Sequence, residues 1–177
     1  HQGNRDRVMR RSSRITHRRR RILRLLRATS DPKKGIVAGV PRTRDTNCVY
    51  IADLDYDENK ELTMNRAGLV RATRVATAFM MVRRDVFETL VKDHPEWNYY
   101  DTRSKRTLNA VFDFKVTEEG YMGEDFLFCD RAREHGFEVW IDPTIPLGHM
   151  GVQEYEGDFG HDVLYPMINP IQGQKVA

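Results

Sequence analysis

The strongest constraint on the fold is that short apolar runs alternate along the chain with segments of helical periodicity. Residues 74–82 are rich in β-branched and aromatic side chains and end in a continuous apolar run at 79–82. Residues 85–92 then place apolar side chains on one face of a helix. A second helix is expected over 123–135, followed by a strand over 137–141. Strands that alternate with helices predict an α/β fold, and residues 74–82 are expected to be its central strand.

Three weaker patterns precede this part of the chain. A narrow apolar stripe over residues 22–26 predicts a helix that docks on a sheet. The apolar run at 35–41, which has glycine near both ends, is expected to be a buried strand. Residues 48–62 alternate around a polar turn and predict a hairpin.

Two regions carry weaker periodicity. Residues 98–121 are expected to form a surface excursion with one short strand at 111–114. Beyond Met150, repeated glycine and proline predict a loop-rich tail.

Charge is divided unevenly along the 177 residues. Residues 1–34 hold thirteen Lys or Arg against two Asp, a net charge of +11, so the remainder carries −8 of the total of +3. Clustered arginines neutralise phosphates, so residues 1–21 are a candidate arm for nucleic acid or an acidic membrane. These residues contain few aliphatic side chains and are expected to be disordered. A solvated, poorly ordered end without a partner is the alternative.

Length and composition favour one compact domain, since 40% of the residues are hydrophobic. We expect a basic arm over 1–21, an α/β domain over 22–165 and a tail over 166–177. No apolar run approaches the roughly 20 residues of a membrane-spanning helix. Cys48 and Cys129 demand no oxidising compartment, and Cys129 is expected to be a buried free thiol. These features predict a cytoplasmic protein.

Four motifs follow one another in a recognisable order. They are Val75–Arg84, Gly123-Glu124-Asp125, Val139–Pro143 and His149-Met150-Gly151. In this order they resemble the acceptor-side half of family 2-like GT-A glycosyltransferases, including several phage-encoded and bacterial members. The resemblance covers roughly residues 22–160. It implies a Rossmann-like mixed sheet with flanking helices that lacks most of the N-terminal nucleotide-binding half.

The resemblance also implies a pair of catalytic acids, Glu124 and Asp125. In inverting members the Asp is the general base that deprotonates the acceptor hydroxyl, a role that falls here on Asp125. Free backbone N–H groups in the first turn of a helix can fix such a carboxylate, and rigid placement suits a general base. The alternative is structural, because acids at this place interact with the helix dipole at roughly 0.3–1 kcal/mol.

Substrate and metal contacts are implied in the same way. The family's Gly-Thr-Gly-Phe strand lines the pocket for acceptor and donor sugar, and it maps onto residues 76–79, which implies substrate contacts from Thr77, Ala78 and Phe79. Alanine in place of glycine is expected to narrow this pocket. His149 resembles the late histidine that completes a Mn²⁺ or Mg²⁺ site. His161 competes for this role, and a hydrogen-bonded structural histidine is the alternative.

Together these motifs predict metal-dependent transfer of a sugar from a nucleotide-sugar donor to an acceptor hydroxyl. The family's Asp-x-Asp motif precedes the helix that corresponds to residues 22–26, where this chain reads Arg-Ile-Thr-His-Arg. Asp53 and Asp55 lie in the hairpin region and are expected to be surface carboxylates. The main alternatives are a nucleic-acid-binding module that uses residues 1–21 and a non-catalytic remnant of a glycosyltransferase. A metal-dependent hydrolase ranks last.

Overall fold

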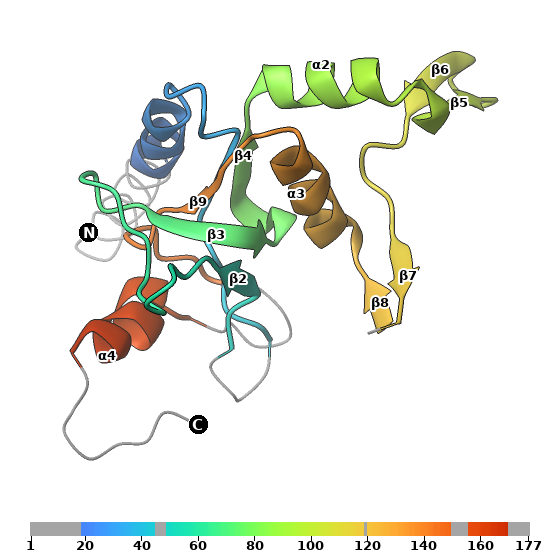
Figure 1. Cartoon of the computed structure of the whole chain (residues 1–177). Coiled ribbons are helices and arrows are strands. Elements are labelled where there is room, and N and C mark those ends of the chain that lie inside the picture. Colours follow the sequence, from blue (N-terminus) through green and yellow to red (C-terminus); the bar gives the residue numbers. More distant parts are fainter. Residues whose placement is uncertain (1–18, 45–48, 119, 150–155, 170–177) are drawn as a thin grey trace, which may run out of the picture.

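The fold is built on a five-stranded sheet with the strand order β2-β3-β9-β1-β4. The computed structural model describes residues 19–44, 49–118, 120–149 and 156–169 (Figure 1). β1 runs parallel to β9, whereas the pairs β1–β4, β3–β9 and β2–β3 are antiparallel. The expected mixed α/β architecture is therefore confirmed. The strands are β1 (Ile36–Ala38), β2 (Ala52–Leu54), β3 (Val70–Val75), β4 (Met80–Val82) and β9 (Val139–Ile141).

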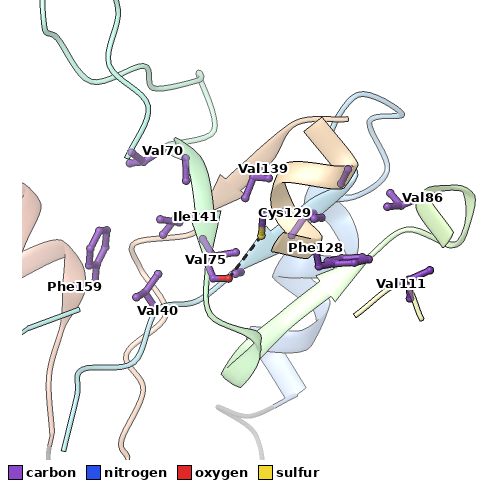
Figure 2. Close-up of a cluster of buried hydrophobic side chains, with 14 of the residues drawn as sticks. Val40, Val70, Val75, Val86, Val111, Phe128, Cys129, Val139, Ile141 and Phe159 are labelled. Carbon is purple, nitrogen blue, oxygen red and sulfur yellow. Dashed lines mark hydrogen bonds between the residues drawn. The ribbon is translucent and has the colours of Figure 1, made fainter. Parts of the chain in front are cut away.

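Two of the predicted helices are confirmed as α2 (Arg84–Asp93) and α3 (Glu124–Glu134). Both bury side chains in the larger core cluster, which contains Val86 and Leu90 of α2 and Phe128 and Cys129 of α3. Figure 2 shows Val86, Phe128 and Cys129 in this cluster. Alternate strand residues point into this cluster because successive side chains of a strand face opposite sides of the sheet. The two helices therefore cover one face of the sheet.

The opposite face carries a smaller core cluster that includes Val37 of β1, Trp140 of β9 and Leu25. Residues 19–28 are helical, which confirms the predicted helix, and Leu25 is 2% exposed. Arg24 anchors the same segment, because its Nε lies 2.7 Å from Oδ2 of the buried Asp142. Docking thus depends on Leu25 and this ion pair, whereas the other apolar residues of the stripe are exposed.

The prediction that residues 74–82 form a central strand is wrong. β3 ends at Val75, the 3₁₀ helix η1 (Thr77–Phe79) follows, and β4 is an edge strand of the sheet. β4 nevertheless packs on both faces, since Met80 and Val82 contact the larger cluster and Met81 contacts the smaller one. An apolar run shows that two faces are covered, but it does not show that two neighbouring strands are present.

Residues 98–121 do leave the body of the protein, yet they form two hairpins rather than one short strand (Figure 1). The predicted strand at 111–114 is absent, and these residues form an irregular segment. It is anchored by Val111, which is buried in the larger core cluster, and by Phe112, whose ring stacks on Phe128 at 4.3 Å. After η2 (Pro95–Trp97), the hairpins pair β5 (Asn98–Asp101) with β6 (Arg106–Asn109) and β7 (Lys115–Thr117) with β8 (Gly120–Met122).

The prediction of a loop-rich tail is wrong for residues 156–169. They form the π-helical turn η3 (Gly160–Leu164) and the short helix α4 (Tyr165–Ile168). Phe159 and Leu164 insert into the larger core cluster, and this apolar burial outweighs the local glycine and proline signals. The hairpin predicted over residues 48–62 is reduced to one bridge between Tyr56 and Leu62 across the polar turn, because β2 pairs with β3 instead.

Several expectations fall on residues that lie outside the described ranges. They concern Cys48, Met150, most of the basic arm at 1–21 and most of the tail at 166–177. In the ranges that the structure describes, the helices are too short or too polar to span a bilayer.

Candidate functional site

Asp125 lies in the first turn of α3, where the helix leaves backbone N–H groups without partners. Its Oδ1 accepts a hydrogen bond from the backbone N–H of Phe126 at 2.9 Å. The side chain is half-buried, and Oδ2 accepts no hydrogen bond from the part of the chain that the structure describes. The carboxylate is therefore held through one oxygen and presents the other.

A pocket of about 430 Å³ opens in front of this carboxylate. Strand β3, the β7–β8 hairpin and the start of α3 each contribute part of its wall. Besides Asp125, the lining includes Ile51, Arg74, Thr117, Tyr121, Met122 and Phe126. The wall thus combines two aromatic rings with a carboxylate and a guanidinium, a mixture typical of sites for small polar ligands.

Arg74 forms the charged wall of the pocket and is itself held by two acids. Its Nε and Nη2 donate to Asp130 of α3 at 2.9 and 2.7 Å, and Nη1 lies 3.3 Å from Asp53 Oδ2. The hydrogen bond to Asp130 is the main reason why the pKa of Arg74 is raised. Two carboxylates thus hold the one guanidinium of the pocket wall. Asp125 forms no ion pair within the described residues, so its carboxylate is the charge of the wall that is left without a basic partner.

The second predicted acid diverges from the first. Glu124 is exposed and does not line the pocket, whereas Asp125 is half-buried and does. Successive helix residues point about 100° apart, and in the first turn of α3 this rotation directs Asp125 and Phe126 to the pocket and Glu124 to solvent. The arrangement assigns the pocket-facing position to Asp125.

The three predicted substrate contacts do not come together with Asp125. Thr77 and Ala78 are exposed in η1, and Phe79 packs with the smaller core cluster on the face of the sheet opposite α3. Phe79 lies so close to Gly39 that an added Cβ would be 3.3 Å from its ring. None of the three lines the pocket described above. Their role in substrate binding stays a prediction.

His149 is placed by two residues of the segment that follows β1. Its Nδ1 donates to the carbonyl of Arg42 at 3.1 Å, and its Nε2 accepts from Arg44 Nε at 2.8 Å. Both ring nitrogens of the neutral imidazole are thus engaged, and a guanidinium occupies the lone pair that a metal would need. As placed, His149 does not fit a metal ligand unless Arg44 moves away.

The other predicted metal ligand, His161, is exposed and contacts Asp162 at 3.2 Å. Across the described ranges, no three His, Cys, Asp or Glu side chains come together as a metal-binding group. The binding of Mn²⁺ or Mg²⁺ therefore stays a prediction. Asp53 and Asp55 pair with Arg74 and Arg71, which confirms them as structural carboxylates near the surface.

Sequence reasoning missed Arg74 and Tyr121 as pocket residues. The alternation of β3 gives no signal for Arg74, because the register shifts after Ala72 and Val75 is the next residue of the strand in the larger core cluster. Tyr121 carries no signal either, since its neighbours show no alternation.

The chain was compared with models of protein families, with curated proteins and with solved structures, and none of the three comparisons gave a match. The resemblance to GT-A glycosyltransferases stays a prediction that rests on the motifs quoted above. The chemistry of the site is therefore argued from Asp125 and the pocket residues around it.

Proposed function

We propose that this chain provides the acceptor-side part of a GT-A glycosyltransferase, which transfers a sugar from a nucleotide-sugar donor to an acceptor hydroxyl. The observation that carries the proposal is the carboxylate of Asp125, which lines the pocket and is held by one backbone hydrogen bond at Oδ1. A volume of about 430 Å³ suits a small polar ligand. The order of the four sequence motifs supports the same assignment.

In the proposed reaction, the acceptor hydroxyl donates a hydrogen bond to Asp125 Oδ2. The hydroxyl oxygen attacks the anomeric carbon of the donor sugar and forms the new glycosidic bond. The bond from that carbon to the nucleoside diphosphate breaks, and its electron pair leaves with the phosphate oxygen. The hydroxyl proton passes to Asp125, which is the general base.

Arg74 has a positioning role in this proposal. Its guanidinium bridges Asp130 and Asp53 and lies 5.9 Å from the ring of Phe126, the residue that follows Asp125. The two ion pairs tie β3 to α3 and to β2. Because both acids neutralise the guanidinium, it fixes the pocket wall instead of binding phosphate.

The test is sugar transfer by the full chain with radiolabelled UDP-glucose, UDP-galactose and GDP-mannose, in the presence of Mn²⁺ and a mixture of saccharide acceptors. Asp125→Asn keeps an oxygen for the Phe126 N–H but removes the base. We expect it to lower the rate of transfer by about 10²–10⁴-fold. Glu134→Gln, at the exposed C-terminal end of the same helix, is the matched control and is expected to transfer like the wild type.

Two results would contradict the proposal. One is the absence of transfer by the wild type with all three donors. The other is an Asp125→Asn variant that transfers at the wild-type rate. The urea midpoint of each variant is measured alongside, so that a loss of activity is separated from a loss of folded protein.

A further inference from the structure

Two aromatic rings lie exposed beside the Asp125 pocket. Phe114 precedes β7, Tyr121 lies in β8, and their ring centroids are stacked at 5.6 Å with an interplanar angle of 28°. Phe114 is 59% exposed and Tyr121 is 70% exposed, although neighbouring aromatics such as Phe87 and Phe128 pack into the core. Tyr121 also lines the pocket. The stacked pair is thus continuous with the site of Asp125.

The strand register adds a third side chain to this surface. Val116 pairs directly with Tyr121 across the β7–β8 ladder and is 73% exposed. Cross-strand partners point to the same face of a hairpin, and so do residues two apart on one strand. Phe114, Val116 and Tyr121 therefore share one face. We call these three residues the aromatic platform.

Both nucleic-acid bases and sugars stack on aromatic rings, and the charges around the platform favour a neutral sugar. The neighbouring pocket contains Asp125 and an arginine already neutralised by two acids. On the hairpin itself, Lys115 and Glu118 are both exposed. A nucleic acid would bring several phosphates next to Asp125, and Lys115 is the one cation among the described residues of the hairpin and the pocket that acids do not already hold. A neutral sugar brings no charge, and the C–H groups of its ring suit the negative face of an aromatic ring.

We infer that the aromatic platform binds a neutral saccharide, which is the acceptor in the proposed transfer. The sugar ring stacks on the free face of Tyr121, whose ring Phe114 holds from the other side, and one of its hydroxyl groups enters the pocket toward Asp125. Its identity as the acceptor rests on the proposed function. Saccharide binding by the platform stands on the exposure, stacking and charge of the residues themselves.

The test is binding of cellobiose, lactose and maltose to the full chain, measured by saturation-transfer-difference NMR. At least one of these disaccharides is expected to bind, and Phe114→Ala and Tyr121→Ala are each expected to weaken its binding about tenfold. Tyr121→Phe keeps the ring and is expected to bind like the wild type. Tyr99→Ala removes an exposed aromatic from the β5–β6 hairpin and serves as the matched control.

The outcomes separate this inference from the proposed function. If no disaccharide binds, if platform variants bind like the wild type, or if oligothymidylate binds there more tightly than all three sugars, the inference is overturned. Asp125→Asn is expected to retain saccharide binding while losing transfer. If that variant still transfers but the platform variants lose binding, the general-base proposal fails and the saccharide site stands. Circular dichroism spectra establish that each variant is folded.

Discussion

At the scale of single residues, the buried thiol of Cys129 makes the free energy of unfolding depend on pH. Its side chain is fully buried, its Sγ lies 3.7 Å from the carbonyl oxygen of Val75 (Figure 2), and burial raises its pKa to about 12. A thiol in the unfolded chain titrates near 8.5. The folded state therefore binds this proton more tightly than the unfolded state does. The contribution of the thiol to the free energy of unfolding is fully present below about pH 8.5 and is lost as the pH rises toward 12.

We predict that the free energy of unfolding falls more steeply between about pH 9 and 11 in the wild type than in Cys129→Ala. The difference in slope is at most about 1.4 kcal/mol per pH unit. Urea titrations at pH 8, 9, 10 and 11 measure it, with Cys48→Ser in both backgrounds so that only one thiol differs. Parallel pH profiles would contradict the prediction.

The sequence identifies the chemistry of individual residues better than their partners. Asp125 could be predicted because an acid before a periodic apolar segment marks a helix start. The surroundings of His149 could not, since Arg42 and Arg44 are 107 and 105 positions away. Local spacing carries no information about contacts at such separations. The same holds for Arg74, whose partner Asp130 is 56 positions away.

At the scale of elements, the end of α3 depends on a glycine. Gly136 has φ +83°, and its N–H donates to the carbonyl oxygen of Arg133. The N–H of Phe137 donates to the carbonyl oxygen of Ala132. This is the Schellman pattern, in which the residue after the cap adopts a left-handed conformation that glycine favours. We predict that Gly136→Ala destabilises the protein by about 1 kcal/mol in urea unfolding.

Lys105 supplies the reciprocal test of this reasoning. It has φ +54° in the turn of the β5–β6 hairpin, so Lys105→Gly relieves a left-handed residue that carries a Cβ. This variant is expected to unfold at the wild-type urea concentration or slightly above it. A loss of stability in Lys105→Gly, or none in Gly136→Ala, would show that backbone conformation does not control these positions.

The sequence predicts individual helices and strands well, but it does not predict their order in the sheet, which depends on contacts between distant residues. The periodicity predicts α2, α3 and β9 because each buries one face or one run of side chains. It misplaces β4 because edge and central strands differ in their partners and can have similar composition. It also misses the β5–β6 and β7–β8 hairpins, whose side chains are largely exposed and so leave little hydrophobic alternation.

At the scale of the whole molecule, the core joins segments from both ends of the described chain. Leu25 closes one face of the sheet, while Phe159 enters the cluster on the other face. The ring of Phe159 contacts Tyr50 edge-on at 5.3 Å, and the Tyr50 hydroxyl donates to Asp162 at 2.6 Å. The segment 156–169 is thus tied to the residues that precede β2, which no periodicity in either segment predicts.

This arrangement predicts that the C-terminal segment unfolds together with the sheet. Phe159 is 3% exposed, so Phe159→Ala should lower the free energy of unfolding by about 3–5 kcal/mol, because it removes a buried ring and leaves a cavity. Tyr165→Ala, an exposed aromatic a few residues later, is the matched control and should change it by less than about 0.5 kcal/mol. Urea unfolding followed by circular dichroism and by tryptophan fluorescence should give one coincident transition in the wild type, since Trp140 reports on the sheet. A Phe159→Ala variant with an unchanged midpoint would show instead that the segment docks on a core that is already complete.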